Sequence, residues 1–372
     1  MEKYTTIGEL RQLILEQEYK YKHHLGFIEA IYILKSKYKL TEIRPTANDF
    51  FMWDLIDFKQ LRLLVDSIPV SLSSITKTVE NWPLLFKNKS NETSLLTFAD
   101  VQISLEMPYS PDDRIILSDY VTNLYVLKGQ ATLHLNNKQI LLSCGDFIIL
   151  TPGTSYYVEC DENDYIINII LQNKNFHYIW ESVLKQNKLL AKFINTITDS
   201  ATGKIMQFFL PVTINTNQII QNLFSEFILN DKFSISNFLS FMQILYANLL
   251  RVANNRNIIN KTKSETSLKI SLLQYIQKHY QTLTLSKLAD EFHYNPAYLS
   301  RMIKQITNND FSRIVTELRI EEAKRLLSTE LNWSISKIAC EVGYKNPEYF
   351  STIFKQWTNK SPRQYRISRL NN

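Results

Sequence analysis

The feature that most constrains this 372-residue chain is a motif that occurs twice near its carboxyl end. The first copy runs from Thr284 to Phe311, and the second runs from Ser334 to Pro362. Matching residues are 50 positions apart before an internal turn and 51 after it: Ala289 and Ala339, Glu291 and Glu341, Tyr294 and Tyr344, then Tyr298 and Tyr349, Ser300 and Ser351, Lys304 and Lys355, Asn308 and Asn359. A repeat of this kind indicates two copies of one supersecondary unit.

Each copy predicts a helix, a short turn and a second helix. Residues suited to helix ends and turns recur in both copies: Thr284 and Ser334 before the first helices, His293 and Gly343 in the turns, Asn308 and Asn359 after the second helices. Ser and Thr cap helix N-termini, whereas Gly and Asn adopt the left-handed conformation at helix ends. The pattern is typical of helix-turn-helix motifs, in which the second helix enters the DNA major groove.

The segment between the copies, Ser312 to Glu330, carries apolar residues at helical spacing. We expect one helix of about 18 residues, or about 27 Å at the standard rise. That length would hold two recognition helices near one DNA turn apart, about 34 Å. The two helices could then read successive major grooves on one face of the duplex.

The whole segment resembles the DNA-binding domain of the AraC/XylS family of bacterial transcription regulators. The motifs that carry the resemblance are LSKLA (285–289), YLSRMIK (298–304), RIEEAKRLL (319–327), ISKIACEVGY (335–344), YFSTIFKQ (349–356) and SPRQYR (361–366). Ile303 departs from the aromatic residue usual before Lys304, and Asn308 and Asn359 replace glycines. The ordered combination implies a DNA-binding regulator, and an activator rather than a repressor.

Positive charge gathers in the same segment. From Leu268 to Asn372 there are 16 Lys/Arg and 9 Asp/Glu, a net charge of +7, against +6 for the whole chain. A basic excess at the repeated motif is expected of a module that binds phosphates.

Cysteine usage and the N-terminus bear on the compartment. Cys144, Cys160 and Cys340 form no C-x-x-C pair, which favours ordinary thiols in a reducing cytosol. The first twenty residues lack the apolar core of a signal peptide, and no run of 18 apolar residues indicates a membrane helix. We therefore expect a cytoplasmic protein that has no membrane partner.

The changing patterns predict an α+β multidomain chain. We expect a helical N-terminal accessory segment (1–92), a cupin-like double-stranded β-helix barrel (93–175), a helical packing or dimerisation region (176–253), a linker (254–267) and the all-α DNA-binding domain with two helix-turn-helix motifs (268–372). Helices at 217–229 and 235–253 resemble those that pair two chains in the family, although packing within one chain is the alternative. A homodimer is the expected assembly.

The barrel prediction rests on short strands between Leu95 and Leu171 that alternate apolar residues with period two. Turn pairs Lys128-Gly129 and Asn136-Asn137 separate them, and the run resembles a cupin in Gly129, Gly145-Asp146-Phe147 and Pro152-Gly153. Metal-dependent cupins resemble one another in an H-x-H pair, a carboxylate and a further His. Here the strand region has only His134, expected as an exposed or locally hydrogen-bonded residue, and Tyr156 stands where another ligand often falls.

We therefore expect no metal, no cofactor and no catalytic residue, and interpret the barrel as a sensor of a small molecule. Candidate effector-binding residues are Tyr120, Tyr125, Tyr156 and Tyr157. Each tyrosine could equally fill the core. A barrel without ligand that serves only as a dimerisation scaffold also stays open.

Family alignment places the DNA-contacting residues early in each second helix. Expected base contacts are Ala297, Ser300, Arg301, Glu348, Ser351 and Thr352, and expected backbone contacts are Lys304, Lys337, Lys345, Lys355, Arg363 and Arg366. Arg301 is the strongest candidate, because a guanidinium can pair bidentately with guanine. Thr352 stands at the matching place in copy two, so the second helix should contribute less base-specific energy.

The leading hypothesis is a promoter-binding regulator that works with RNA polymerase if it activates. Two alternatives are a cupin enzyme with a DNA-binding appendage and a regulator that responds to a partner protein through its N-terminal half. The effector, the operator and the regulated pathway are not encoded in any motif we identify.

Overall fold

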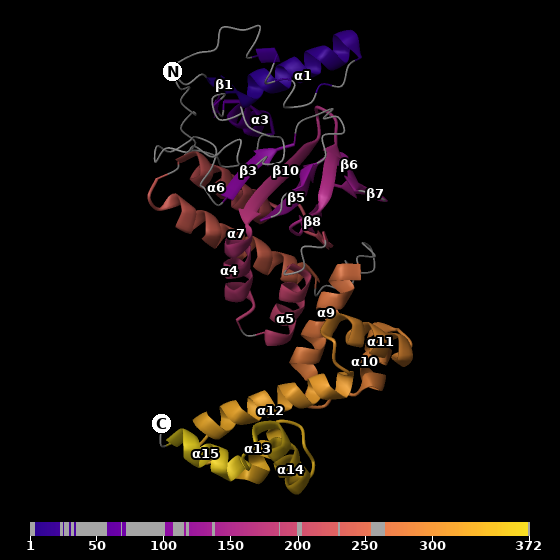
Figure 1. The fold of residues 1–372 in the computed structure, drawn as a ribbon, viewed down its shortest axis with the longest axis vertical. Coiled ribbons are helices and arrows are strands. Elements are labelled where there is room, and N and C mark those ends of the chain that lie inside the picture. The colour runs from indigo at the N-terminus through magenta and orange to yellow at the C-terminus, as the bar shows by residue number, and fades with distance from the viewer. Residues whose placement is uncertain are drawn as a thin grey trace. The chain divides into compact units, whose positions relative to one another are not determined.

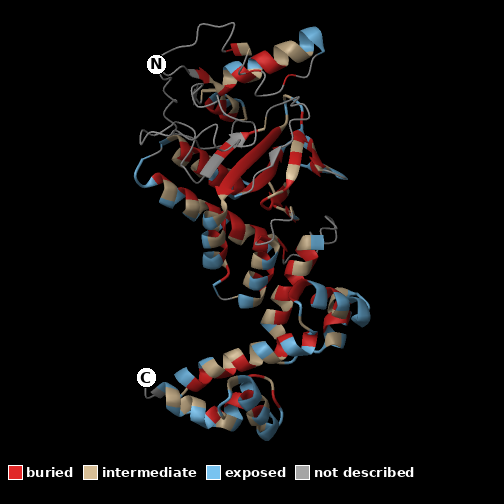
Figure 2. Cartoon of the chain, in the orientation of Figure 1, coloured by how far each residue is buried: buried red, intermediate tan, exposed pale blue. Residues whose placement is uncertain are grey.

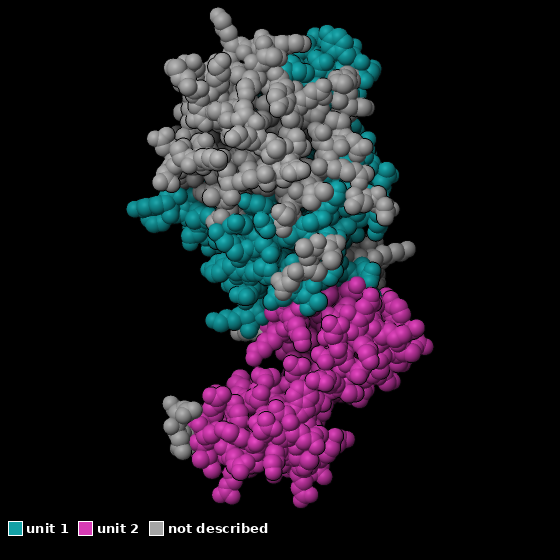
Figure 3. Space-filling view, in the orientation of Figure 1, with its two compact units in different colours: residues 1–185, 194–268 teal, residues 186–193, 269–372 magenta. Residues whose placement is uncertain are grey.

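The computed structural model describes residues 4–22, 25, 30, 33–34, 58–67, 69–71, 101–106, 115–116, 119–135, 138–185, 187–198, 203–229, 231–253 and 265–370. The chain forms two compact units (Figure 3). The N-terminal unit comprises residues 1–185 and 194–268, and the C-terminal unit comprises residues 186–193 and 269–372. In the described residues, no helix combines the length and the apolar character needed to span a bilayer.

We had predicted a mostly helical N-terminal segment, and its described part contains two short strands as well as helices. Helices α1 (Ile7–Tyr21) and α3 (Phe58–Ser67) pack together, and Arg11 forms an ion pair with Asp66. Strands β1 (Tyr4–Thr6) and β2 (Pro69–Ser71) pair antiparallel beside them. Three-residue strands give too short an alternation to be recognised in a sequence.

The segment docks on the following sheets through Arg62 of α3. Its Nη2 donates to the carbonyls of Glu162, at 2.8 Å, and Asp164, at 3.1 Å. The guanidinium also lies 4.4 Å from the centroid of the Tyr165 ring. These contacts attach α3 to the loop before β10.

Two antiparallel sheets follow (Figure 1). One has the order β11-β8-β5-β10-β3, with β11 at Ile205–Phe209, β8 at Asp146–Leu150, β5 at Tyr120–Lys128, β10 at Tyr165–Gln172 and β3 at Val101–Leu105. The other has the order β4-β9-β6-β7, with β4 at Ile115–Ile116, β9 at Ser155–Glu159, β6 at Gln130–Leu135 and β7 at Lys138–Ser143. The predicted turn at Asn136-Asn137 lies outside the described residues.

Strand β11 lies within the region from 176 to 253 that we had predicted to be helical. It lies between α5 (Lys188–Thr198) and α6 (Ile214–Leu229) and pairs antiparallel with β8. Its burial alternates, with Met206 and Phe208 facing inward. Five alternating residues between two helices are a weak signal, and only pairing with β8 makes the strand stable.

The two sheets share one core, whose buried members are Leu124, Val126, Ala131, Leu133, Leu142, Ile148, Leu150, Tyr156, Val158, Cys160 and Ile166. Central strands β5 and β10 are buried along nearly their whole length (Figure 2). They are buried because α4 (Asn173–Val183), α6 and α7 (Ser234–Ala253) contact the five-stranded sheet. A strand covered on both faces becomes almost continuously apolar, as YIINIILQ is.

One polar contact fixes α7 against the sheet. The hydroxyl of Tyr246 donates to Asn123 Oδ1 at 2.6 Å, and Asn123 Nδ2 donates to the carbonyl of Ile169 at 3.1 Å. Tyr246 also stacks on Trp180 of α4, with ring centroids 4.6 Å apart. Both polar side chains are fully buried and satisfied, as buried polar groups must be to avoid a desolvation penalty.

The C-terminal unit contains the predicted duplicated motif (Figure 1). Its helices are α9 (Glu265–His279), α10 (Leu285–Phe292), α11 (Pro296–Thr307), α12 (Phe311–Thr329), α13 (Ile335–Glu341), α14 (Pro347–Thr358) and α15 (Pro362–Leu370). The connecting helix α12 has 19 residues, close to the prediction. Helix α9 begins three residues inside the predicted linker, and residues 254–264 of that linker lie outside the described part.

The predicted helix ends are confirmed. Thr284 and Ser334 accept hydrogen bonds from the amides of Lys287 and Lys337. His293 and Gly343 have φ of 57° and 99°, and Asn308 and Asn359 have φ of 55° and 59°. Left-handed backbone therefore recurs at equivalent places in both copies, which is why Asn and Gly occupy them.

Of these four positive-φ positions, only position 343 requires a glycine. A Cβ there would lie 2.1 Å from the carbonyl oxygen of Gln281, in the turn between α9 and α10. The turn that precedes the first motif therefore approaches the turn inside the second motif closely.

We expect Gly343→Ala to destabilise the C-terminal unit by at least about 1–3 kcal/mol, because it combines strained φ with a backbone clash. Thermal unfolding followed by circular dichroism would measure the loss. Asn359→Gly, also at positive φ, is the matched control and should keep or slightly raise stability. Equal melting of Gly343→Ala and wild-type protein would contradict the close approach.

Candidate nucleic-acid interface

Each second helix buries one side and exposes the other. In α11 the buried residues are Leu299, Met302, Ile303, Ile306 and Thr307, and in α14 they are Phe350 and Phe354. Both helices begin with the same local signal, an Asn whose side chain accepts backbone amides, followed by Pro at the first helical position. The chain thus presents two outward helical faces.

On α11 the structure brings Ala297 and Arg301 to the exposed face, whereas Ser300 is half-buried. The Nε of Arg301 donates to the carbonyl of Ala297 at 3.4 Å, so the side chain lies back along its own helix. Lys304, one turn later, forms an exposed ion pair with Asp310 at 3.2 Å. An exposed pair of this kind is weak and can exchange for a phosphate.

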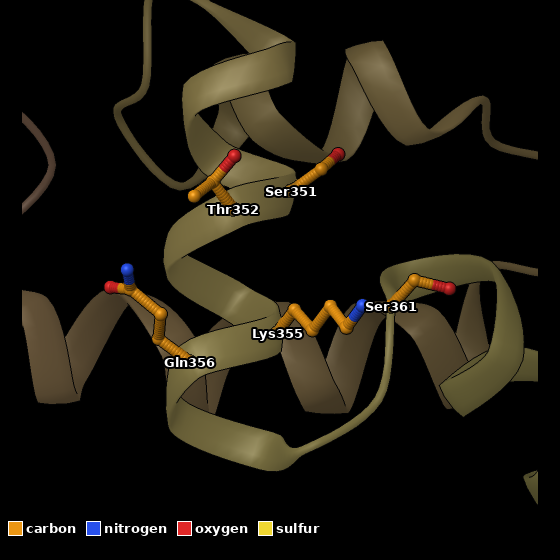
Figure 4. Close-up of a pocket in the computed structure, with 5 residues that line it drawn as sticks. All are labelled: Ser351, Thr352, Lys355, Gln356 and Ser361. Atoms are coloured by element: carbon orange, nitrogen blue, oxygen red, sulfur yellow. The ribbon is translucent and has the colours of Figure 1, made fainter.

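On α14 three predicted residues line one groove (Figure 4). The lining residues are Ser351, Thr352, Lys355, Gln356 and Ser361. The hydroxyls of Ser351 and Thr352 donate to the carbonyls of Pro347 and Glu348, which leaves oxygen lone pairs outward as acceptors. Glu348, also predicted, is exposed in the first turn.

Gln356 and Ser361 are groove residues that our sequence reasoning missed. Gln356 lies one helical turn after Thr352, so an i, i+4 extension of the predicted face would have found it. Ser361 precedes α15, and its hydroxyl accepts from the amide of Gln364 while its own amide donates to the Gln364 side chain. A reciprocal cap of this type is readable in the sequence SPRQ.

The predicted backbone contacts fall into two groups. Lys337, Lys345, Lys355 and Arg363 are exposed, and the ammonium of Lys337 lies 3.9 Å from the centroid of the Trp333 ring. Arg366 differs, because its Nη2 donates to the carbonyl of Trp333 at 2.7 Å and its Nε is buried. Arg366, which we predicted as a DNA backbone contact, thus joins α15 to the start of α13 and stays a prediction as a DNA contact.

Two exposed helical faces, each the second helix of a helix-turn-helix motif, define a DNA-binding protein. Comparison with known proteins supports the assignment of DNA binding. The family profile described as "Helix-turn-helix domain" matches residues 288–368. The chain is 27% identical to RafR, the raffinose operon transcriptional regulatory protein of Pediococcus pentosaceus, over 295 residues, which are 76% of this chain and 96% of RafR.

Two further similarities each cover about a quarter of the chain. YobQ of Bacillus subtilis, an uncharacterised HTH-type transcriptional regulator, is 37% identical over 95 residues, 25% of this chain and 39% of YobQ. The C-terminal domain of AraT, a response regulator from Geobacillus stearothermophilus, is 45% identical, with a TM-score of 0.26 over 27% of this chain and 85% of that domain. The chain is therefore a DNA-binding transcription regulator, and its C-terminal unit is similar to the DNA-binding domain of the AraC/XylS family.

In the N-terminal unit the four candidate tyrosines do not share one surface. Tyr156 belongs to the core between the sheets, where its hydroxyl donates to Thr122 Oγ1 at 3.2 Å. Tyr125 lies on the other face of β5, because its neighbours Leu124 and Val126 point into that core. Its hydroxyl donates to the carbonyl of Leu210 at 3.1 Å, so it fills space as the alternative interpretation held.

Tyr157 lies on the outer face of the four-stranded sheet. It stacks on His134 of the neighbouring strand, with ring centroids 4.1 Å apart and planes 10° from parallel. His134 is buried and not exposed, and its ring nitrogens contact Glu159 Oε2 at 2.8 Å and Gln139 Nε2 at 3.1 Å. Tyr125 is therefore buried, whereas Tyr157 on the outer face and Tyr120 at the start of β5 are half-buried.

The described residues include no group of three or more His, Cys, Asp and Glu side chains that could hold a metal ion. The core between the two sheets contains a cluster of polar side chains that the sequence did not reveal. Asn168 Nδ2 donates to Glu106 Oε1 at 2.6 Å, and both lie beside Tyr156 and Thr122. Burial raises the pKa of Glu106 to about 7, and the bond from Asn168 opposes this shift.

Glu106 should make stability depend on pH. A carboxyl whose pKa is raised by folding stays protonated in the folded chain while it ionises in the unfolded chain. Its contribution to stability is thus fully present below pH about 4.5 and is lost as pH rises to about 7. We expect the melting temperature of the wild type to fall relative to Glu106→Gln between pH 4.5 and 7.5.

Melting curves at several pH values would measure this difference. Glu181→Gln, at an exposed position on α4, is the matched control. Curves for wild type and Glu106→Gln that run parallel across this pH range would show that Glu106 is not desolvated.

Proposed function

We propose that this regulator reads promoter DNA with α11 and α14 together, and that α11 supplies more of the base specificity. The observation that carries the proposal is the duplicated motif with two outward second helices joined by α12. At 19 residues, α12 is about 28 Å long at the standard rise. That length is comparable with the spacing of successive major grooves, about 34 Å.

The two helices offer different chemistry to DNA. Helix α11 exposes Arg301, whose guanidinium suits guanine O6 and N7. Helix α14 exposes Thr352, Gln356 and Lys355 around its groove, of which Gln suits adenine. We assign base contacts to Ala297, Ser300 and Arg301 in the first helix and to Glu348, Ser351 and Thr352 in the second.

We assign backbone contacts to Lys304, Lys337, Lys345, Lys355 and Arg363. Each ammonium or guanidinium that meets a phosphate releases counterions, which makes affinity depend on salt. Phosphate contacts position the protein without reading sequence. The exposure of these cations around both motifs supports this division of roles.

We propose that the N-terminal unit is a cupin-like sensing domain. Its support is a pair of antiparallel sheets around one core, bounded by positive-φ glycines at Gly129, Gly145 and Gly153. Because similarity to RafR extends through this unit, we propose that the chain controls a carbohydrate operon. Homodimerisation, activation with RNA polymerase and a cytoplasmic location complete the proposal, since promoters and polymerase are found there.

Replacing Arg301 by Ala should relax sequence preference at one base pair by about 1–3 kcal/mol. The physical reason is the loss of two hydrogen bonds to one base edge, whereas phosphate contacts stay intact. Genomic footprinting would supply the operator, and gel-shift titrations on its single-base variants at fixed salt would measure the preference.

Lys355→Ala is the matched control on the other helix. Its affinity should fall uniformly across sequences, and the slope of log affinity against log salt should drop by about 1. If Arg301→Ala behaved in this uniform way, Arg301 would contact phosphate and not a base.

A further inference from the structure

The duplicated motif allows the exposed residues of its two second helices to be compared with each other. Helices α11 and α14 have the same length and begin with the same Asn-Pro cap. Their exposed residues nevertheless differ at equivalent positions, because Ala297 corresponds to Glu348 and Arg301 corresponds to Thr352. Exposed positions of the motif are therefore free to diverge between the copies.

Other positions have the same residue in both helices. Apart from the helix ends, those that are exposed or half-buried in both copies are Tyr298 and Tyr349, Ser300 and Ser351, Lys304 and Lys355, Gln305 and Gln356. The two serines are half-buried, and the two lysines are already assigned to the DNA backbone. The tyrosines and glutamines are fully exposed and have no assigned contact, although packing in the core does not require them.

The Tyr and the Gln of each helix form one flank of its reading face. They are seven residues apart, close to two helical turns, so they lie on the same side of the helix. Arg301 follows Tyr298 by three residues and lies about 60° round the helix axis from it. The major groove is about 12 Å wide, hardly more than a helix with its side chains. When Arg301 points to the bases, the flank therefore faces the phosphates at the groove edge.

Both tyrosine rings are supported by a second ring from the turn. Tyr298 stacks on Tyr294, with centroids 5.3 Å apart and planes 21° from parallel, and Tyr349 lies 6.2 Å from Tyr344. Within the described part of the chain, the hydroxyls of Tyr298 and Tyr349 make no hydrogen bond to another residue. Each hydroxyl is thus held at a defined place and can donate to a partner outside the chain.

Contacts with phosphates and contacts with bases have different consequences in a duplicated motif. The sugar-phosphate backbone has the same chemistry at every site, whereas the bases that two helices meet differ. A residue that contacts phosphate can therefore stay the same in both copies, and a residue that reads a base can differ. Lys304 and Lys355, assigned to the backbone, are identical, whereas Arg301 and Thr352, assigned to bases, differ.

We propose that Tyr298 and Gln305 of α11, and Tyr349 and Gln356 of α14, donate hydrogen bonds to DNA phosphates at the edge of each major groove. Phenols and side-chain amides are neutral donors that contact phosphate oxygens in protein–DNA complexes. The four residues form the same clamp twice, and the differences between the two half-sites are read by the residues beside them. This inference rests on the proposed function and adds to it the uncharged part of the backbone contact.

Gel-shift titrations of the full-length protein on its operator, on single-base variants and on unrelated DNA test the proposal. Tyr298→Phe and Tyr349→Phe keep each ring and remove only the hydroxyl, so each should weaken binding at least about threefold on every sequence. Because a phenol is neutral and releases no counterion, the slope of log affinity against log salt should equal that of the wild type. Tyr178→Phe, at an exposed position on α4, is the matched control and should bind as the wild type does.

Gln305→Ala and Gln356→Ala give an independent pair of variants, for which we expect the same uniform loss and the same salt slope. A loss confined to one base pair would make these residues base readers and overturn the proposal. Wild-type DNA affinity in both Tyr→Phe variants would overturn it as well, and if promoter activation were lost at the same time the tyrosines would contact a protein. These outcomes leave the regulator function standing, whereas a wild-type protein that binds no DNA would remove both.

Discussion

The geometry of the DNA-binding unit depends on the side chain of Arg319, in the middle of α12. Its Nε donates to the carbonyl of Tyr280 at 3.2 Å and its Nη2 donates to the carbonyl of Gln281 at 2.9 Å. The same guanidinium lies 5.2 Å from the centroid of the Tyr344 ring. One planar cation therefore joins the turn before the first motif to the turn inside the second motif, which a lysine could not do with the same geometry.

The carbonyl of Gln281 is the point where these constraints meet. It accepts from Arg319 and approaches the Cα of Gly343 so closely that no Cβ fits. Hydrogen bonds to a charged donor contribute about 1.5–3 kcal/mol, and a cation over a ring about 0.5–2 kcal/mol. Together they hold the two motifs against α12 as one body, so that α11 and α14 present fixed faces to a duplex.

The turns inside the two motifs differ in how their tyrosines are packed. Tyr344 is buried beneath Arg319, whereas its counterpart Tyr294 is 40% exposed and stacks on Tyr298, with centroids 5.3 Å apart. Only the second turn faces the joint with α12, so only there is the aromatic ring covered. The repeat in the sequence predicts two equal motifs, and packing explains why they differ.

Much of the C-terminal unit could be predicted because its signals are local. Caps, positive-φ residues and helical spacing act within a few positions, and the structure places Thr284, Gly343 and Asn359 as those rules require. The exposed faces of α11 and α14 follow from the same periodicity. The hydrogen bond of Arg366 could not be predicted, because its acceptor, the carbonyl of Trp333, is 33 residues away and no sequence pattern links the two residues.

The N-terminal unit depends on pairings that local rules do not specify. Strand β11 becomes a strand only through β8, and Asn168 meets Glu106 only through the register of β10 with its neighbours. Parity alone, however, would have shown that adjacent Tyr156 and Tyr157 point to opposite faces of a strand. That rule removes one of the two from any interior site before a structure is known.

Because side chains alternate between the two faces of a strand, neighbouring residues of β5 make different polar contacts. Thr122 faces the interior and accepts from Tyr156, whereas Asn123 faces the helices and accepts from Tyr246 of α7. A shift of one residue in the pairing of β5 would exchange these side chains and leave both Tyr156 and Tyr246 unpaired. Because each unpaired buried hydroxyl costs about 1–3 kcal/mol, polar bonds on opposite faces fix the register of the central strand more strongly than its apolar residues can. The interior cluster and the attachment of α7 are consequently held by one strand in one register.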